Sequence, residues 1–463
     1  MYMDIQEEHM SQRTGRKIYI PLAVGTVLQA LPVFFAFSDL PAALCSLCWP
    51  LFMLIAVRNT ERPRQVVFSG FVFWFSFCIR YGTFLGFGFV NILIACAVYL
   101  PVCFVLWLPF VIDRLLIRQT GSWFAILVFP LLYTLVCVVL NQLSLPVMGD
   151  PSCAVIALPL LAQNVSVLLS YGLCFLVLWF SSLLALALCG KRTGQRIAAL
   201  ITAVVIAVAL PVYGAVRLSQ RTEPAGVLHI AVFNKAESDF TAPVYPYTEA
   251  EATALFEEHL AFAAGNKADL AVSTEEYLYF MEENEEEKLA GLSAIIAKYG
   301  IPVLLSVDVE NRSGHPYSNR TYMYDGNGQL LGKYIKHTLV PVVENGYYRA
   351  GKEDPLSVTL DLGGIRCRIA AAICYDCANP LFIRRIPADT QLLINPCWEW
   401  DTANAEQRRM TALRAIENNV TLFKPTYDGW TYAVDPWGIF SGMTDTRPLR
   451  GQAYMMDVPV YTR

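Results

Sequence analysis

Long apolar stretches fill the first half of the chain and end near residue 217. A helix needs about 20 apolar residues to cross a bilayer. Stretches of that length predict seven membrane-spanning helices, at residues 18–36, 40–57, 66–83, 87–111, 122–142, 162–189 and 195–216. No small-residue cleavage site follows the first stretch, so we expect a retained anchor and not a cleaved signal peptide.

Lysine and arginine collect in alternate loops between these stretches. The basic loops contain Arg13, Arg16, Lys17, Arg58, Arg62, Arg64, Arg114, Arg118, Lys191, Arg192 and Arg196. The other loops contain only Arg80. Because short cytoplasmic loops carry the basic excess, the pattern predicts a cytoplasmic N-terminus. After seven crossings the second half of the chain is expected outside the cytoplasm, and one span more or fewer would reverse this side.

The second half alternates short apolar runs with amphipathic segments. The runs predict strands at residues 227–234, 269–275, 302–309, 366–375, 392–396 and 421–429. Apolar residues that recur every three or four positions predict helices at residues 249–265, 285–299 and 403–419. We therefore expect a membrane domain at residues 1–217, followed by an α/β layered domain at residues 225–463.

The composition also indicates that the first half of the chain lies in lipid and the second half in water. The chain is 55% hydrophobic and 16% charged, and its mean hydropathy of +0.42 is outside the range of an ordinary soluble domain. Only seven of the 39 acidic residues precede residue 221. The net charge of −4 and the absence of a basic tract exclude nucleic acid as an expected partner.

The cysteines do not predict a metal centre. Most of the 13 lie in the apolar half, where cysteine usually serves as a small packing residue. Cys374 and Cys377 form a C-x-x-C pair, but no second pair and no spaced histidine cluster accompanies them. We therefore expect no metal and no cofactor.

Three apolar runs end on a residue that can do chemistry. Glu275 closes DLAVSTE, Lys336 closes GKYIK and Cys374 closes AAIC. The carboxyl ends of strands in an α/β sheet meet at one crevice. There the carboxylate can take the thiol proton, and the ammonium can stabilise both the thiolate and a developing oxyanion. Taken singly, each residue is better explained by a plain reading, as an ion pair, a surface lysine or an inert packed thiol.

The sequence motifs around these residues resemble those of the nitrilase superfamily. DLAVSTE, YIKHTLVPVVE, ICYDCANP, INPCW and MTALRAIENN are similar to its successive motifs. The resemblance implies an α-β-β-α sandwich in which Glu275 is the base, Lys336 the lysine and Cys374 the nucleophile. It also implies that Glu344 is the additional glutamate that some members need.

Other residues of these motifs are expected to support the site. The backbone N–H of Tyr375 is the expected oxyanion donor, together with Lys336. Asp376 follows in the same motif, and Asn395 and Trp398 either line the cleft or pack in the core.

Two loops and one helix pair complete the prediction. Arg414 and Glu417 match a structural pair of the superfamily, and their spacing of three also fits a helix salt bridge. Residues 240–247 and 344–351 are candidate lids, although ordinary surface loops are equally compatible with them. His337 is expected to face away from the side that Lys336 faces, because side chains alternate along a strand.

Seven spans followed by such a domain resemble the apolipoprotein N-acyltransferase family. The similarity extends to FPLLYTLVCVVLNQ and LPLLAQNVSVLLSYGLCFLVLWF in the apolar half. It implies a multi-pass protein of the bacterial inner membrane that takes an acyl chain from a phospholipid as a Cys374 thioester. The acyl chain would then pass to the N-terminal amine of a diacylglyceryl-cysteine lipoprotein. The expected partners are this donor, this acceptor and membrane lipid.

The chain also departs from the family pattern. It has Ser273 and Thr274 where Trp-Pro is usual, Asp376 where Glu is usual and Val343 where Gly is usual, and the usual final transmembrane helix is expected to be missing. These differences bear on the substrate more than on the fold. Three alternatives stay open: a membrane-tethered amidase with water as acceptor, an N-acyltransferase for another amine, and a non-catalytic membrane binding or transport protein.

Overall fold

A computed structural model describes residues 2–34, 39–82, 89–120, 124–145, 150–236, 248–311, 317–341, 343–399 and 404–462. The predicted lid at 240–247 lies outside them. The contacts divide the chain into two compact units. The first comprises Met1–Leu143, Val147–Ser219 and Ala405–Arg409, and the second comprises Ser144–Pro146, Gln220–Asn404 and Met410–Arg463.

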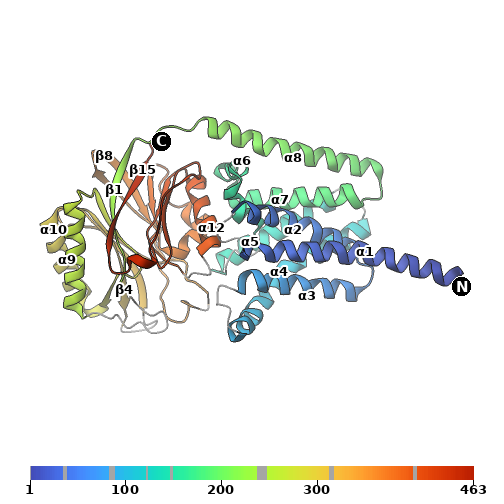
Figure 1. The fold of residues 1–463 in the computed structure, drawn as a ribbon, viewed down its shortest axis with the longest axis horizontal. Helices are drawn as coiled ribbons and strands as arrows, with labels where there is room; N and C mark the ends of the chain where they lie inside the picture. The colour runs from blue at the N-terminus through green and yellow to red at the C-terminus, as the bar shows by residue number, and fades with distance from the viewer. Residues whose placement is uncertain are drawn as a thin grey trace. The chain divides into compact units, whose positions relative to one another are not determined.

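The first unit is built from long helices (Figure 1). They are α1 (Tyr2–Ala30), α2 (Asp39–Asn59), α3 (Pro63–Gly82), α4 (Phe89–Thr120), α5 (Ala125–Gln142), α7 (Val165–Cys189) and α8 (Thr193–Ser219). Short segments η1 (Leu31–Phe34), η3 (Pro151–Ala157) and α6 (Pro159–Ala162) accompany them. Each of the seven predicted spans overlaps one long helix.

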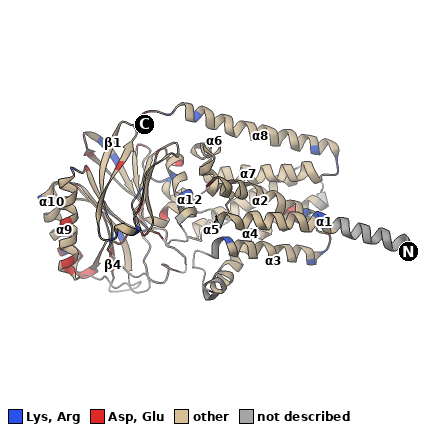
Figure 2. Ribbon diagram, in the orientation of Figure 1, with Lys and Arg blue, Asp and Glu red and all other residues tan. Residues whose placement is uncertain are grey.

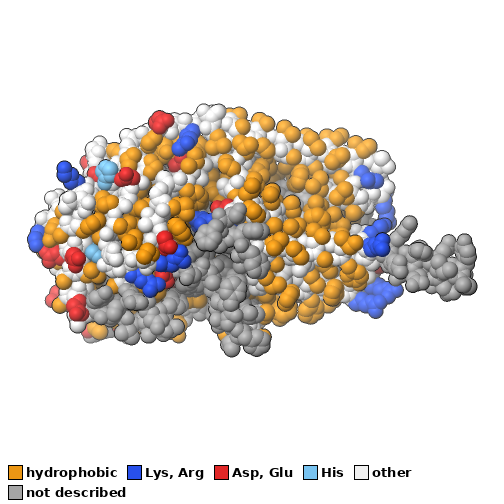
Figure 3. All heavy atoms as spheres, in the orientation of Figure 1, with side chains coloured by type: hydrophobic (Ala, Val, Ile, Leu, Met, Phe, Trp, Pro, Cys, Tyr) orange, Lys and Arg blue, Asp and Glu red, His pale blue; other side chains and the backbone are white. Residues whose placement is uncertain are grey.

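Five of these helices are long and apolar enough to cross a membrane. They are α2, α5, α7, α8 and the part of α4 from Cys96 to Ile117. In the described residues, helices α1 and α3 are not among these candidate spans, so a total of seven membrane-spanning helices stays a prediction. Figure 2 shows few charged residues along these helices, and Figure 3 shows apolar side chains covering their exposed face.

Two arginines of the first unit have polar partners between the helices. Arg58 Nε donates to Asp113 Oδ2 at 2.8 Å, and Asp113 is fully buried. The Arg80 guanidinium donates to Ser46 Oγ at 3.2 Å. Charges inside a membrane domain are costly unless partnered, so these contacts are explained as structural pairs between helices.

The second unit contains two sheets. The first sheet has the order β15 (Ala453–Val460), β1 (Gly226–Phe233), β2 (Leu270–Ser273), β4 (Val303–Glu310), β5 (Tyr317–Tyr324), β6 (Leu330–Ile335), with β3 (Leu278–Met281) also pairing with β4. The second has the order β14 (Phe440–Asp445), β13 (Trp430–Val434), β11 (Thr421–Lys424), β9 (Leu392–Ile394), β8 (Ile365–Ala371), β7 (Leu356–Leu362). A short parallel pair joins β10 (Cys397–Trp398) to β12 (Thr426–Tyr427).

The two sheets pack face to face through an apolar core. Side chains of β1, β2 and β4 meet side chains of β8, β9 and β11 in one buried cluster. The opposite faces of β1 and β4 pack against α9 (Glu249–Gly265) and α10 (Glu285–Tyr299). Figure 1 shows α9 and α10 on one side of the sheets and α12 (Asn404–Asn418) on the other. The predicted α-β-β-α sandwich is confirmed.

Several boundaries differ from the sequence prediction. The strand predicted at residues 366–375 ends at Ala371, and Cys374 opens the short helix η5 (Cys374–Ala378). The strand predicted at 421–429 divides into β11 and β12. Strands β3, β5, β7, β10, β13, β14 and β15 were not predicted, although β15 pairs with β1 along its whole length.

Candidate active site

The three predicted catalytic residues come together from two sheets. Glu275 lies two residues after β2, and Lys336 directly follows β6 of the same sheet. Cys374 lies three residues after β8 of the facing sheet. All three side chains are buried, with exposed fractions of 2%, 0% and 5% respectively. The sandwich therefore brings the carboxylate, the ammonium and the thiol to one buried place.

Hydrogen bonds fix the orientation of the carboxylate. Lys336 Nζ donates to Glu275 Oε1 at 2.8 Å and to Glu344 Oε1 at 2.6 Å. Asn319 Nδ2 also donates to Glu275 Oε1, at 2.7 Å. The backbone N–H of Trp398 donates to the other oxygen, Glu275 Oε2, at 2.7 Å. A carboxylate held by this many donors has little freedom to leave the site.

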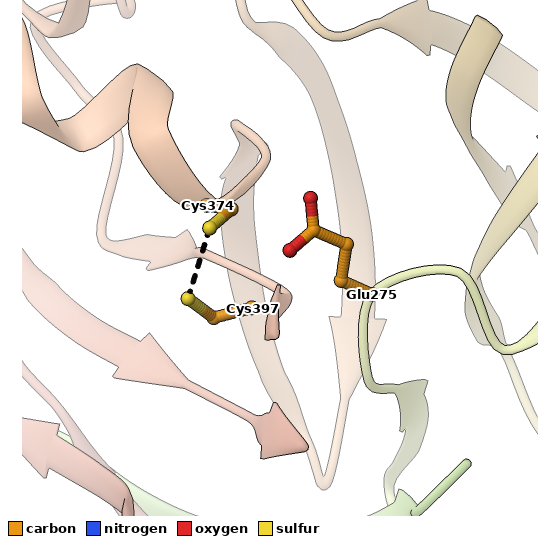
Figure 4. Close-up of side chains that lie close together, drawn as sticks. All are labelled: Glu275, Cys374 and Cys397. Carbon is orange, nitrogen blue, oxygen red and sulfur yellow. Dashed lines mark hydrogen bonds between the residues drawn. The ribbon is translucent and has the colours of Figure 1, made fainter. Parts of the chain in front are cut away.

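The thiol lies beside this carboxylate on a strained turn. One carboxylate oxygen of Glu275, Cys374 Sγ and Cys397 Sγ all lie within 4.8 Å of one another (Figure 4). Cys374 has a φ of 41°, which is unusual for a residue with a side chain. Asn395 Nδ2 holds this turn, because it donates to the carbonyls of Ala372 at 2.8 Å and Cys374 at 3.2 Å. Backbone strain of this kind persists only when the surroundings enforce it.

Asp376 ties the lysine segment to the cysteine turn. Its Oδ2 accepts hydrogen bonds from Tyr334 Oη at 2.7 Å and from the Ile373 N–H at 2.9 Å. Its Oδ1 accepts from the N–H groups of His337 at 3.1 Å and Thr338 at 2.6 Å. The shorter carboxylate at this family position thus contacts the residues that flank Lys336 and Cys374, and its contacts are structural.

Burial and charge set the protonation states at rest. Burial alone would lower the pKa of Lys336, but Glu275, Glu344 and Cys374 raise it well above the usual value. Burial raises the pKa of Glu344 to about 7, despite the nearby lysine. The hydrogen bond with Cys397 and burial both raise the pKa of Cys374 well above its usual value. Cys374 is therefore a thiol in the resting site and needs a base to become a nucleophile.

Residues 239–449 match the carbon-nitrogen hydrolase family. The matched residues lie in the second half of the chain, and we name this part the carbon-nitrogen hydrolase domain after the family it is similar to. The predicted resemblance to the nitrilase superfamily is thereby confirmed. An amidase structure from Nesterenkonia sp. is similar to the chain, with 18% identity, a TM-score of 0.41, and coverage of 51% of this chain and 90% of the amidase.

The curated relatives extend beyond this carbon-nitrogen hydrolase domain. The apolipoprotein N-acyltransferase of Sinorhizobium medicae is 25% identical over 356 residues, which is 67% of this chain and 64% of that protein. The Rhizobium rhizogenes enzyme of the same name is 26% identical over 328 residues, covering 62% and 59% respectively. The chain thus spans less than two thirds of the length of these relatives. Its apolar helices and its bacterial relatives indicate a bacterial membrane protein.

A second buried charge cluster in the carbon-nitrogen hydrolase domain was not predicted. Tyr348 Oη donates to Glu276 Oε1 at 2.9 Å and to Asp308 Oδ2 at 3.3 Å. Lys235 Nζ lies 3.6 Å from Glu276 Oε2 and 4.1 Å from the centroid of the Trp398 ring. Burial raises the pKa of both Glu276 and Asp308. The second glutamate of STEE and the tyrosine of NGYYRAG were the signals available in the sequence.

A third buried group lies next to Cys397. Cys397 Sγ is 4.0 Å from Glu399 Oε1, which forms an ion pair with Lys424. All three side chains are buried. The sequence motif INPCW contains Cys397, but its contact with Cys374 depends on the approach of β10 to the η5 turn.

The remaining predicted residues have identifiable places in the domain. Tyr375 is buried next to Cys374, and its role as an oxyanion donor stays a prediction. His337 Nδ1 is 3.2 Å from the Gly351 carbonyl, and its ring stacks on Phe382 with centroids 4.2 Å apart. Arg414 Nη1 lies 3.0 Å from Glu417 Oε2 in a buried pair on α12, which fits a structural role. Trp398 contributes its backbone to Glu275 and its ring to Lys235, so it borders both polar groups.

Proposed function

We propose that this chain is a membrane N-acyltransferase that moves an acyl chain from a phospholipid to the N-terminal amine of a diacylglyceryl-cysteine lipoprotein. The observation that carries the proposal is the buried contact set of Glu275, Lys336 and Cys374 in a chain with apolar helices. Similarity to apolipoprotein N-acyltransferases supports the choice of donor and acceptor. We propose the bacterial inner membrane as the location, with the hydrolase domain outside the cytoplasm.

In the first half-reaction, Glu275 takes the proton from the Cys374 thiol as the sulfur attacks the ester carbonyl of the phospholipid. Lys336 and the backbone N–H of Tyr375 stabilise the oxyanion. When the tetrahedral intermediate breaks down, the C–O bond to the lysophospholipid is lost. The leaving oxygen takes the proton back from Glu275, and the acyl chain remains on sulfur as a thioester.

In the second half-reaction, the neutral amine of the acceptor attacks the thioester carbonyl. Glu275 takes a proton from the attacking nitrogen, the C–S bond breaks, and the Cys374 sulfur regains a proton. The products are an amide and the free thiol. Water would give a fatty acid instead, so a transferase must exclude water from the thioester. The buried position of the three side chains supports this requirement.

Intact-mass measurement on the full chain in phospholipid nanodiscs tests the proposal. We expect an increase in mass of one acyl chain, which is absent from Cys374→Ala. The matched control is Cys377→Ala, which removes another buried thiol of the same turn and should keep the adduct. Addition of a diacylglyceryl-cysteine peptide should remove the acyl group from Cys374 and increase the mass of the peptide by one acyl group.

Three results would oppose the proposal. An adduct of equal yield on Cys374→Ala would remove the assigned nucleophile. Release of fatty acid at the same rate with and without the peptide would favour the amidase alternative, in which water is the acceptor. A protein that binds lipid without any covalent adduct would favour the non-catalytic alternative.

A further inference from the structure

The proposed nucleophile is in contact with a second sulfur. Cys397 Sγ lies 3.2 Å from Cys374 Sγ. With one Glu275 oxygen, the two sulfurs form a set of three potential ligand atoms within 4.8 Å of one another. Figure 4 shows the carboxylate of Glu275 directed toward the two sulfurs. Acyl transfer as proposed above uses one thiol, so Cys397 is left without a role in it.

We propose that Glu275, Cys374 and Cys397 form a binding site for a thiophilic divalent cation, with Zn²⁺ as the simplest example. Two thiolates and a carboxylate are ligands that zinc commonly takes in proteins, and three protein ligands leave one position open. Spacing along the chain does not predict this site, because Cys374 and Cys397 are 23 residues apart. The inference does not depend on acyl transfer.

The three atoms are close enough for tetrahedral coordination. Bond lengths of about 2.3 Å to sulfur and about 2.1 Å to oxygen place neighbouring ligand atoms roughly 3.5–3.8 Å apart. The two sulfurs are 3.2 Å apart, slightly closer than this range, and all three atoms lie within 4.8 Å of one another. Small side-chain rotations are therefore sufficient to receive the ion.

The carboxylate has an oxygen available for a metal. Glu275 Oε1 already accepts hydrogen bonds from Lys336 and Asn319. Glu275 Oε2 accepts only from the Trp398 N–H in the described part of the chain. One lone pair of Oε2 is therefore free to bind an ion, while Lys336 and Asn319 orient the carboxylate from behind as outer partners.

Cationic side chains lie near the proposed site. One divalent ion with two thiolates and one carboxylate has a net charge of −1. Lys336 lies 2.8 Å from Glu275 and shares its positive charge with Glu344 at 2.6 Å. Next to Cys397, Lys424 and Glu399 form a pair that is neutral overall. A buried anionic site with a cation in contact avoids the cost of an isolated buried charge.

Binding of the ion would compete with any reaction at Cys374. The ion occupies the sulfur electrons and the carboxylate that a nucleophilic attack requires. Two thiol protons are released when both sulfurs bind the metal. The ion therefore acts as a reversible inhibitor, and removal of the ion by a chelator returns the free thiol.

The test uses the full chain in detergent, stripped of metal and kept reduced, with no phospholipid present. We measure the number of bound Zn²⁺ ions by equilibrium dialysis and the thiolate-to-metal charge-transfer absorption with Cd²⁺. The alkylation rate of Cys374 is measured by peptide mass spectrometry. Zn²⁺ should slow alkylation at least tenfold, and EDTA should restore the rate. Cys397→Ala should bind one Zn²⁺ fewer and lose this protection, while Cys374 stays reactive without metal.

The matched control is Cys367→Ala, which removes a buried thiol of β8 and should keep both binding and protection. Equal protection of Cys374 in Cys397→Ala would overturn the proposal. So would protection that a reductant reverses and a chelator does not, because an intramolecular disulfide would then explain the thiol pair. Since no lipid enters the assay, its outcome is independent of whether the chain transfers acyl groups.

Discussion

Replacing Asp376 by Asn tests the link between the two halves of the site. The carboxylate accepts four hydrogen bonds, from Tyr334, Ile373, His337 and Thr338. An amide keeps one acceptor oxygen and places an NH₂ group where the other stood. Whichever way the amide turns, two of the four donors lose their acceptor in a fully buried position.

The size of the effect follows from this count. A hydrogen bond to a charged group contributes about 1.5–3 kcal/mol, so the loss of two corresponds to roughly 3–6 kcal/mol. The neutral amide recovers part of this, because burial raises the pKa of Asp376 and so disfavours its ionised form. After this recovery, we expect a net loss of about 2–4 kcal/mol in unfolding free energy.

The assay is urea unfolding of the full chain in detergent, followed by near-ultraviolet circular dichroism and paired with the alkylation rate of Cys374. Asp361→Asn is the matched control, because Asp361 is exposed on β7 and the chemical change is the same. The control should stay within about 0.5 kcal/mol of the native protein. Asp376→Asn should also change the alkylation rate, since Ile373 and the residues flanking Lys336 lose their shared anchor.

One result would refute the reasoning. If Asp376→Asn unfolds at the same urea concentration as the control and Cys374 reacts at the native rate, the four bonds do not hold the site together. The departure from the family pattern at this position would then be neutral for the architecture.

Other predictions concern charge. Protonation of Glu344, whose pKa is about 7, removes its ion pair with Lys336, so acylation should slow as pH falls through 7, and Glu344→Gln should remove this inflection. The folded-state pKa of Glu344 lies above its ordinary value of 4.5, so its contribution to stability is complete below pH 4.5 and is lost as pH rises through 7. Urea unfolding at pH 5 and at pH 8 measures this loss. Glu275→Gln should slow acylation about 10²–10⁴-fold in rapid-quench mass spectrometry. Arg414→Met should cost about 3–5 kcal/mol in urea unfolding, since it removes the buried ion pair with Glu417.

The sequence predicted helices better than strands, for local reasons. Residues 249–265 and 285–299 match α9 and α10 at both ends. A capping box between Thr248 and Glu251 starts α9, and Gly300 with a φ of 73° ends α10. The hairpin of β7 and β8 was missed at its first strand, although Gly363 and Gly364 have the positive φ values of a tight turn. The G-G dipeptide between alternating apolar residues was the available signal.

Residues that end strands were found, and polar residues that depend on packing were not. Glu275 and Cys374 follow apolar runs, and the sheet order brings such ends together. Lys235 and Asp308 have ordinary neighbours in the sequence, and only the packing of the sandwich decides that they are buried near the site. The Cys397 contact is also a tertiary one, which no local pattern encodes.

The pairing of β15 with β1 has a consequence for biosynthesis. The first strand of the hydrolase domain forms its antiparallel ladder with residues 453–460, which the ribosome adds more than two hundred residues later. Until then, one edge of β1 presents unpaired amides and carbonyls to any other extended segment. The first sheet of the domain is therefore complete only after nearly all of the domain has been translated. A chain halted before residue 453 exposes an aggregation-prone strand edge shortly after α8 in the sequence.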